Sequence, residues 1–404
     1  MQLQTLKGFR DFLPNEARKR QYVINTLKKV FESYGFEPLE TPALEYEEVL
    51  LGKYGDEGDK LMYRFEDNGG RKVALRYDQT VPTSRVVAQY GNKLPIPFKR
   101  YQIQPVWRAE NTQKGRFREF LQCDIDTIGL NSLSTDAEIV ACVINSLESL
   151  GFKNYKVLIN DRVVFSGSSP KVIRIVDKLK KIGQEKVIAE LVETGMSNEE
   201  ALKTLEKIAS SKLTPALETI FMALKDLGID KNKYEFSPTL ARGLDYYTGM
   251  IFEVEIAGYE AGSVVGGGRY DNLIGMFSDK QTPATGCAFG FDRIVEAMNE
   301  LDLFPKDLTT SKALVTVFSM ELGSNSIKVA NALREAGINT ELYLDANIKL
   351  EKQLKYADQK GIPYVVIIGP DEAKNNTVTL KNLKAKTQQT ISLDEAISSL
   401  KMTG

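Results

Sequence analysis

The chain has 404 residues, enough for about two or three domains of ordinary size. Its 53 basic and 54 acidic residues nearly cancel, which excludes the strongly basic class of nucleic-acid-binding protein, so any contact with a polyanion must be local. The sequence contains no histidine, the commonest general base, and hydrolysis by a Ser-His-Asp or Cys-His arrangement is therefore excluded. Any catalysis must use Arg, Lys, Tyr and carboxylates.

The sequence also indicates the cellular compartment in which the protein works. No apolar run approaches the ~18 residues of a membrane span, and Met1–Lys7 lacks the apolar core of a secretory signal. We therefore expect a cytoplasmic protein. Three cysteines, Cys123, Cys142 and Cys287, are odd in number and lack metal-ligand spacing, which predicts buried thiols rather than a disulfide framework or a zinc site.

The first part of the chain predicts a helix followed by a strand-rich block. Apolar residues recur at helical spacing after Asn15, a residue suited to an N-cap, until Gly35. Alternation before Pro42 is typical of an edge strand. The expected elements are a helix over 15–34, an edge strand over 36–42, strands over 72–76, 98–108 and 119–128, and helices over 81–90 and 135–151.

The composition changes from about residue 165 to 232. Lys, Glu and Leu dominate at helical spacing while aromatic residues nearly vanish, so we expect a helical insertion. One apolar stripe over Val172–Ile182 predicts its first helix, and Ser197 with Glu200 predicts a capping box. The charged outer face of that first helix is typical of a solvated surface, although it could also contact a polyanion. It carries Lys171, Arg174, Lys178, Lys180 and Lys181.

The chain ends in a different pattern. A β-type texture returns over 236–298, and after residue 311 strands and amphipathic helices alternate, as in a small α/β domain. Its second helix is predicted to expose Lys349, Lys352, Lys355 and Lys360. We therefore expect one domain over 1–311, with the insertion inside it, and a second over 312–404.

Residues 242–249 read Arg-Gly-Leu-Asp-Tyr-Tyr-Thr-Gly and are the most informative segment. Gly243 and Gly249 allow the backbone to turn or to approach a ligand closely. Arg242 supplies a planar charged donor for phosphate or carboxylate oxygens, and Tyr246 and Tyr247 add aromatic walls with polar tips. A strand entered after a turn is the alternative, but a second charged segment favours a substrate pocket.

That second segment is 105–126. In a hairpin with its turn at 111–115, residues two apart on one strand share a face. Several guanidiniums beside a polar turn suggest a polyphosphate site, and an aromatic ring is available to stack on a base. An exposed charged hairpin would explain the alternation but not this clustering of arginines. The candidate side chains are Arg108, Glu110, Arg116, Arg118 and Phe120.

These segments together resemble the histidyl-tRNA synthetases, which are class II aminoacyl-tRNA synthetases. The resemblance covers nearly the whole chain. Segments Tyr34–Glu45, Arg108–Asp126 and Thr285–Arg293 resemble the three class II motifs, whereas 242–249 and Gly266–Asp271 resemble the pieces specific to the histidine enzyme. Lys7–Pro14 also resembles the opening of the family. The implied fold is α+β: an antiparallel-sheet catalytic domain with a helical insertion, then a small α/β anticodon-binding-like domain.

The resemblance implies a role for each matching residue at the ATP site. Arg108 would hold the α-phosphate of ATP and the substrate carboxylate, and Glu110 would read the adenine amino group. Arg242 would contact the α-phosphate, taking part of a role that other class II enzymes give to a metal. The implied ATP-binding residues are Arg108, Glu110, Arg116, Phe120, Arg242 and Arg293, with Arg116 and Arg293 on the outer phosphates.

The resemblance also implies a histidine subsite. Asp78 and Thr80 match positions that bind the α-amino group, with Gln79 between them in the same subsite, and Gln122 matches a position near the carboxylate. Asp126 and Tyr247 would read the two ring nitrogens. The implied histidine-binding residues are Asp78, Gln79, Thr80, Arg108, Gln122, Asp126, Arg242, Tyr246, Tyr247 and Tyr270, and the implied catalytic residues are Arg242, Arg108 and Gln122.

The function implied is ligation of histidine to tRNA(His), with ATP as a substrate that brings Mg²⁺, no zinc, and a homodimer as the assembly. Position 121 is Leu where the family commonly has His or Tyr, a departure that removes no matched contact. Two alternatives belong to other classes. A regulatory subunit of ATP phosphoribosyltransferase usually lacks the terminal domain and does not keep the sequence of the segment 242–249 intact. A synthetase-like tRNA-binding sensor would have lost some of the arginines that contact ATP.

Overall fold

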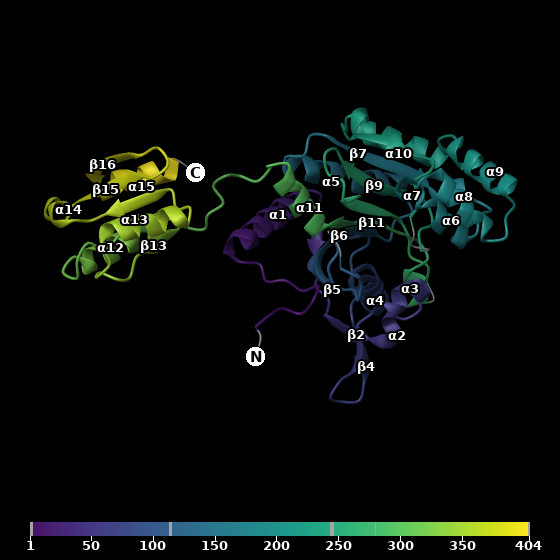
Figure 1. Cartoon of the computed structure of the whole chain (residues 1–404), viewed down its shortest axis with the longest axis horizontal. Coiled ribbons are helices and arrows are strands. Elements are labelled where there is room, and N and C mark those ends of the chain that lie inside the picture. The colour runs from purple at the N-terminus through teal and green to yellow at the C-terminus, as the bar shows by residue number, and fades with distance from the viewer. Residues whose placement is uncertain (1–2, 113–114, 243–245, 279, 403–404) are drawn as a thin grey trace. The chain divides into compact units, whose positions relative to one another are not determined.

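The computed structural model describes residues 3–112, 115–242, 246–278 and 280–402. The chain forms two compact units (Figure 1). The first comprises Met1–Phe12 and Arg20–Leu303, and the second comprises Leu13–Lys19 and Phe304–Gly404. The first is built on a mainly antiparallel sheet and the second is a small α/β unit, so the α+β fold class predicted from the sequence is confirmed.

Among the described residues, eight strands form the large sheet of the first unit in the order β1-β5-β6-β11-β10-β9-β7-β8. Neighbours run antiparallel except at the two edges, where β1 pairs with β5 and β8 pairs with β7 in parallel. The strands are β1 (Glu37–Pro38), β5 (Phe98–Trp107), β6 (Glu119–Ile128), β7 (Tyr155–Asp161), β8 (Tyr234–Phe236), β9 (Met250–Ile256), β10 (Val265–Arg269) and β11 (Ala284–Gly290).

Four helices accompany this sheet. α5 (Leu133–Ser149) lies against β6, β10 and β11, and α10 (Pro215–Asp226) packs on α5. The helix α5 begins where the Ser132 side chain accepts a hydrogen bond from the Ser134 amide, and most of its residues are buried. In α1 (Pro14–Ser33), Val23, Leu27 and Phe31 recur every four residues and are fully buried, which explains why this segment is helical. α11 (Phe291–Glu300) follows β11 directly.

A smaller sheet of order β2-β4-β3 lies beside the end of the large one and extends away from it as a hairpin (Figure 1). Three helices accompany it, and Val81 and Val87 of one of them are buried in a core shared with the pocket region. The elements are β2 (Leu44–Tyr46), α2 (Glu47–Leu50), α3 (Gly55–Lys60), β3 (Arg64–Glu66), β4 (Lys72–Leu75) and α4 (Thr80–Tyr90).

Between β7 and β8 the chain is helical: α6 (Pro170–Val176), α7 (Leu179–Ile182), α8 (Gln184–Val192), α9 (Asn198–Ala209) and then α10. The capping box predicted at Ser197 is confirmed, because its hydroxyl and the Glu200 carboxylate each bond the other's backbone amide. The single helix predicted over Val172–Ile182 is wrong. It ends at Val176, and a new helix begins after Lys178, although both keep their apolar side chains on one core.

The second unit has a five-stranded sheet, in the order β13-β12-β14-β15-β16 within the described residues. β12 pairs in parallel with both of its neighbours, as the continuous apolar runs predicted, and the last two strands are antiparallel. The elements are β12 (Ala313–Val315), α12 (Gly323–Glu335), β13 (Thr340–Leu342), α13 (Leu350–Gln359), β14 (Tyr364–Ile367), α14 (Pro370–Asn375), β15 (Thr377–Asn382), β16 (Thr387–Ser392) and α15 (Leu393–Met402).

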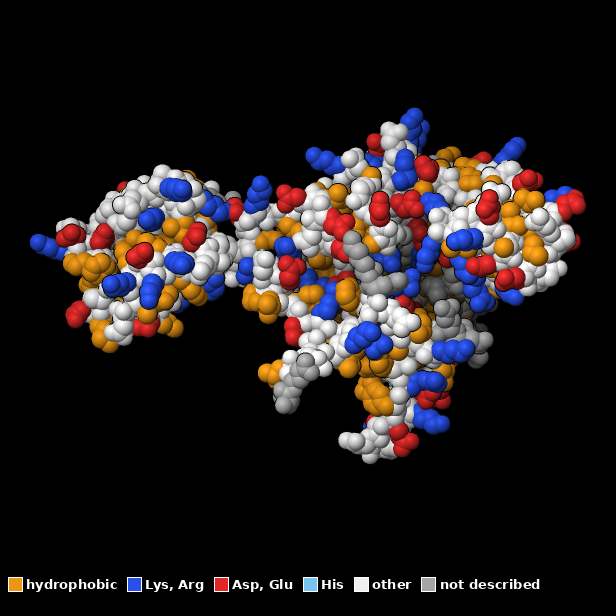
Figure 2. All heavy atoms as spheres, in the orientation of Figure 1, with side chains coloured by type: hydrophobic (Ala, Val, Ile, Leu, Met, Phe, Trp, Pro, Cys, Tyr) orange, Lys and Arg blue, Asp and Glu red, His pale blue; other side chains and the backbone are white. Residues whose placement is uncertain are grey.

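Two further predictions can be checked against the structure. Cys123, Cys142 and Cys287 are free and buried, as expected. Lys349, Lys352 and Lys355 are exposed, also as expected. None of the helices in the described ranges is long and apolar enough to cross a membrane. Positive and negative side chains are interspersed over the face of the first unit seen in Figure 2, which agrees with the near-zero net charge.

Candidate active site

A cavity of about 340 Å³ lies over the middle of the large sheet, within the first unit. Its volume falls within the range of ordinary small-molecule sites, ~300–1,000 Å³. Its walls come from β6, β9, β10 and β11, the loop before β6, the start of α4 and the start of α11. The site residues predicted from the sequence that line it are Asp78, Thr80, Arg108, Glu110, Arg116, Phe120, Gln122, Asp126, Arg242, Tyr246, Tyr247, Tyr270 and Arg293.

Two of the predicted side chains do not line the cavity. One is Arg118, whose Nε donates to the Glu110 carbonyl at 3.1 Å. The other is Gln79. Its side chain is fully buried, and its amide nitrogen donates to the carbonyls of Gln104 at 2.9 Å and Gln122 at 3.0 Å. It therefore ties the start of α4 to β5 and β6. These hydrogen bonds place its amide nitrogen among backbone groups of the sheet. A contact between Gln79 and histidine stays a prediction.

At the start of α4, Asp78 is held from two sides. The Tyr54 hydroxyl donates to it at 2.8 Å and the Val81 amide at 3.1 Å. Burial raises the pKa of Asp78, while these hydrogen bonds and the nearby Arg108 oppose that rise. Asp78 is thus a fixed acceptor at the cavity wall, suited to an ammonium group.

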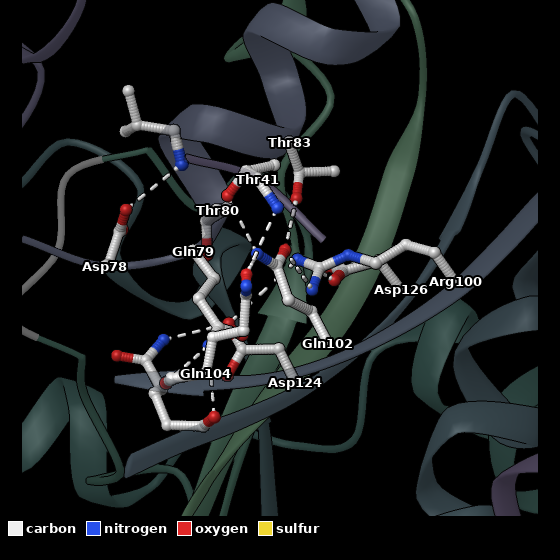
Figure 3. A network of polar contacts seen from close by, with 12 residues as sticks. Thr41, Asp78, Gln79, Thr80, Thr83, Arg100, Gln102, Gln104, Asp124 and Asp126 are labelled. Atoms are coloured by element: carbon white, nitrogen blue, oxygen red, sulfur yellow. Dashed lines mark hydrogen bonds and ion pairs between the residues drawn. The ribbon is translucent and has the colours of Figure 1, made fainter. Parts of the chain in front are cut away.

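On β6, Asp126 lies at the bottom of the cavity between a cation and a phenol. Its carboxylate is 2.5 Å from the Arg100 guanidinium, which is fully buried, and it also accepts a hydrogen bond from the Tyr270 hydroxyl. Figure 3 shows the side chains of Arg100 and Asp126 pointing toward each other from adjacent strands. Burial raises the pKa of Asp126, and the Arg100 guanidinium opposes that rise. The two side chains therefore form a buried ion pair.

Asp124 adds a second buried carboxylate to this network. It lies 4.0 Å from Arg100 and accepts a hydrogen bond from the Gln122 amide at 2.8 Å. Burial, opposed by Arg100 and reinforced by Asp126, raises the pKa of Asp124 to about 8. With both carboxylates ionised, Arg100, Asp124 and Asp126 would together carry one net negative charge. Protonation of Asp124 or binding of a cationic ligand would neutralise it.

Four arginines line the same cavity. Arg108 is fixed by the Tyr77 carbonyl at 3.1 Å, and its guanidinium lies 4.4 Å from the centre of the Tyr77 ring and 5.1 Å from that of Phe120. Arg293 donates to the Ser263 carbonyl at 2.7 Å, and Arg116 pairs with Glu110 at 3.3 Å. The fourth, Arg242, comes from the octapeptide. Together they form a field of fixed positive charge suited to phosphate groups.

Arg242 pairs with Glu253, which lines the same cavity from β9. Gly266, the register partner of Glu253 on β10, makes room for this pair. A Cβ atom at Gly266 would come within 2.8 Å of the Arg242 guanidinium carbon, so a side chain there would displace it. Within the octapeptide, 243–245 lie outside the described residues, whereas the rings of Tyr246 and Tyr247 are in contact, tilted by 52° with their centres 4.7 Å apart.

Sequence reasoning missed several residues of the site. Tyr54 and Arg100 carry no local signal, because one sits in a loop and the other in a strand of ordinary alternation. Glu253 is one of two acidic residues in β9, and the sequence does not indicate which faces Arg242. Gly286 was included only as part of a motif. Its missing side chain leaves room for Asp126, whose carboxylate carbon would be 2.5 Å from a Cβ there.

Comparison with known proteins identifies the family of the chain. The family model described as "Histidyl-tRNA synthetase" matches residues 8–167 and 169–294, and the model described as "Anticodon binding domain" matches residues 312–403. The chain belongs to the histidyl-tRNA synthetase family. It is therefore a member of the aminoacyl-tRNA synthetases, a class of ligases, as the sequence motifs implied.

Individual relatives extend the match over the whole length. The chain is 40% identical to the histidine–tRNA ligase of Cytophaga hutchinsonii, covering 98% of each chain, and 41% identical to that of Wolinella succinogenes, covering 94% of each. The crystal structure of histidyl-tRNA synthetase from Nostoc sp. PCC 7120 is 31% identical, covers 100% of both chains and has a TM-score of 0.88. These matches confirm the fold class and the family.

Proposed function

We propose that the chain activates histidine with ATP to form histidyl-adenylate and pyrophosphate, and then transfers histidine to the 3′ end of tRNA(His). Family membership over the whole length supports this activity. The observation that carries the proposal is that one cavity holds both parts of the required chemistry. It is lined by a buried carboxylate and phenols and also by four arginines.

In the proposed complex, histidine occupies the end of the cavity near Asp126. Asp78 and Thr80 bind its α-ammonium group, with Gln79 holding their segment in place. Asp126 and Tyr247 bind the ring nitrogens, and Tyr246 and Tyr270 form the walls. A pocket built to hydrogen-bond a polar ring rejects analogues without those groups by up to ~10⁴-fold. When Asp124 is ionised, the two carboxylates around Arg100 also favour a ring that carries a proton.

ATP occupies the arginine-lined end. Phe120 stacks on adenine, Glu110 accepts from its amino group, and Arg116 and Arg293 bind the outer phosphates. Arg108 and Gln122 hold the substrate carboxylate near the α-phosphorus, and Arg108 and Arg242 stabilise the charge that develops there. Because each of these guanidiniums is already fixed by a neighbouring group, little reorganisation is needed during the reaction.

The chemistry follows from that placement. The histidine carboxylate attacks the α-phosphorus in line, the bond to the bridging oxygen breaks, and pyrophosphate leaves with its electrons. The terminal ribose hydroxyl of the tRNA then attacks the aminoacyl carbonyl, the bond between that carbonyl and the phosphate oxygen breaks, and AMP leaves with its electrons while the hydroxyl proton passes to a phosphate oxygen. No protein histidine is required, since positioning and charge neutralisation are the main demands.

The metal and the partners complete the proposal. Among the described residues, no group of three or more Cys, Asp or Glu could hold a metal ion, and the pocket carboxylates Glu110 and Glu253 already pair with arginines. We therefore assign Mg²⁺ to the phosphates of ATP, its usual mode of binding. We further propose a cytoplasmic homodimer whose domain 312–404 contacts the anticodon, with residues 1–311 forming the catalytic domain and 165–232 its insertion.

The two alternative functions are less well supported. A regulatory subunit of ATP phosphoribosyltransferase would usually lack the terminal domain, which the family model for anticodon binding matches here. A tRNA-binding sensor would lack ATP-contacting arginines, whereas Arg108, Arg116 and Arg293 all line the cavity. Both alternatives predict a protein that does not activate an amino acid.

One experiment separates these possibilities. Pyrophosphate exchange into ATP is measured for the purified protein with each amino acid in turn. We expect exchange with histidine alone, abolished in the Arg108→Ala variant and kept in Arg64→Ala, whose exposed side chain pairs with Glu47 and is not part of the cavity lining. Absence of histidine-dependent exchange by a folded protein would favour the sensor or regulatory function.

A further inference from the structure

The segment Gly8–Phe12 contacts the base of the loop that precedes β6. The Gly8 carbonyl accepts hydrogen bonds from the amides of Arg118 at 3.0 Å and Glu119 at 3.3 Å. Gly8 has a φ of +88°, and a Cβ there would come within 2.7 Å of the Arg118 side chain. Both the backbone conformation and the close approach therefore require glycine at this position.

Two residues further on, Arg10 touches two separate walls of the cavity. Its guanidinium carbon lies 3.2 Å from the centre of the Phe117 ring, and its nitrogen lies 3.0 Å from the Asp292 carboxylate. Phe117 precedes β6 and Asp292 is in the first turn of α11, and both line the cavity. One side chain thus bridges two elements that are far apart in the sequence.

The bridge is reinforced from α1. Arg20 lies 2.5 Å from the same Asp292 oxygen, and its guanidinium lies 3.9 Å from the centre of the Phe12 ring. The Asp292 side chain is 9% exposed, so this pairing is shielded from solvent and salt. A stacked and paired guanidinium of this kind is held in a fixed orientation, which a flexible ammonium group cannot reproduce.

The position of this bridge in the sequence gives it a function. Phe117 is the neighbour of Arg116, and Asp292 is the neighbour of Arg293, the two arginines assigned to the outer phosphates of ATP. We propose that Arg10 is a positioning residue for ATP: by joining Phe117 to Asp292 it sets the separation of Arg116 and Arg293. This inference rests on the proposed function and adds to it a residue outside the three class II motifs.

The test compares Arg10→Met with Lys7→Met, which removes an exposed charge from the residue just before this segment. In histidine-dependent pyrophosphate exchange, we expect Arg10→Met to raise KM for ATP and for pyrophosphate by about tenfold or more, because correct spacing of the phosphate ligands is lost. KM for histidine should stay within about twofold of the original value, as should every constant of Lys7→Met.

Further variants separate positioning from folding. Arg10→Lys keeps the charge beside Asp292 but loses the planar face over Phe117, so we expect an intermediate KM for ATP. Phe117→Leu should raise the same constant, and the double variant should add little to either single change, since both break one bridge.

Several results would overturn the inference. They are an unchanged KM for ATP in Arg10→Met, a parallel rise in KM for histidine, or strict additivity with Phe117→Leu. If Arg10→Met does not fold, Arg10→Lys and Phe117→Leu carry the test, and unchanged KM values for ATP in both would reject the proposal. A chain with no histidine-dependent exchange before any substitution would instead refute the proposed function itself.

Discussion

Arg242 shows how a single residue depends on its surroundings in this site. Its guanidinium is paired with Glu253 on β9 and lies 5.9 Å from the centre of the Tyr247 ring. Glycine at position 266 leaves the space it occupies. A donor fixed in this way before substrate binds can stabilise developing charge at little cost in reorganisation.

The substitution Arg242→Lys tests that role. A lysine keeps the positive charge but loses the planar fork, so we expect the rate of adenylate formation to fall by ~10²–10³-fold. The affinities for histidine and ATP should change much less. Single-turnover formation of histidyl-adenylate measures the rate directly. Arg64→Lys is the control, because Arg64 also pairs with a glutamate, Glu47, but is exposed.

Near-normal adenylate formation by Arg242→Lys would remove Arg242 from the catalytic role. A loss of similar size in Arg64→Lys would instead point to a general effect of replacing arginine in this protein.

At the scale of elements, the strands β10 and β11 carry glycines where other strands carry side chains. Gly286 of β11 is the register partner of Asp126 on β6. A Cβ at Gly286 would lie 2.5 Å from both the Ile125 carbonyl oxygen and the Asp126 carboxylate carbon. Neither neighbour can yield easily, because one is backbone and the other is paired with buried Arg100.

We therefore expect Gly286→Ala to disturb Asp126 and to destabilise the first unit by ~1–3 kcal/mol, the usual cost of overpacking. KM for histidine should rise more than KM for ATP. Gly275→Ala is the matched control, since a Cβ there meets its nearest neighbour at 3.5 Å, an ordinary contact. Pyrophosphate-exchange kinetics and urea unfolding are measured for both variants. The same KM for histidine and the same free energy of unfolding in the two variants would contradict the role of Gly286.

The sequence predicted many elements because they carry local signals. Apolar spacing and a terminal glycine located α1, and a Ser-x-x-Glu capping box located the start of α9. The break between α6 and α7 escaped prediction, because the apolar stripe continues across Asp177 and Lys178 and tertiary packing decides where the helix ends. The ion pair between Arg100 and Asp126 was not predicted, although the predicted hairpin with its turn at 111–115 already places these two residues opposite each other.

The same limit applies to the site. The octapeptide and the arginine-rich hairpin were visible as local concentrations of charge and glycine, and the resemblance to a family then placed the other residues. Neither Arg10 nor Glu253 was predicted to belong to the site, because the role of each depends on which residues distant in the sequence it contacts.

At the scale of the whole molecule, we expect the first unit to activate the amino acid and the second unit to contribute to tRNA binding. Removal of residues 312–404 should leave histidine-dependent pyrophosphate exchange measurable, because the cavity lies entirely within the first unit. Aminoacylation of tRNA should weaken, and the salt dependence of tRNA binding should become shallower as phosphate contacts are lost.

The full-length variant Lys349→Gln/Lys352→Gln/Lys355→Gln separates loss of these charges from loss of the domain. We expect it to reproduce the shallower salt dependence while leaving pyrophosphate exchange unchanged, since these exposed lysines are outside the cavity lining. Equal charging of tRNA by the truncated and the full-length protein would reject a tRNA-binding role for the second unit.

The strand order of the large sheet also governs how the active protein can be made. β6 ends at Ile128 and must pair with β11, which begins only at Ala284. Such long sequence separation makes loop closure costly and folding slow. A nascent chain that has not yet passed residue 290 lacks the central strand, so the edges of β6 and β10 remain open to unwanted pairing. Synthesis of the first unit should therefore depend on protection by chaperones until its last strand emerges from the ribosome.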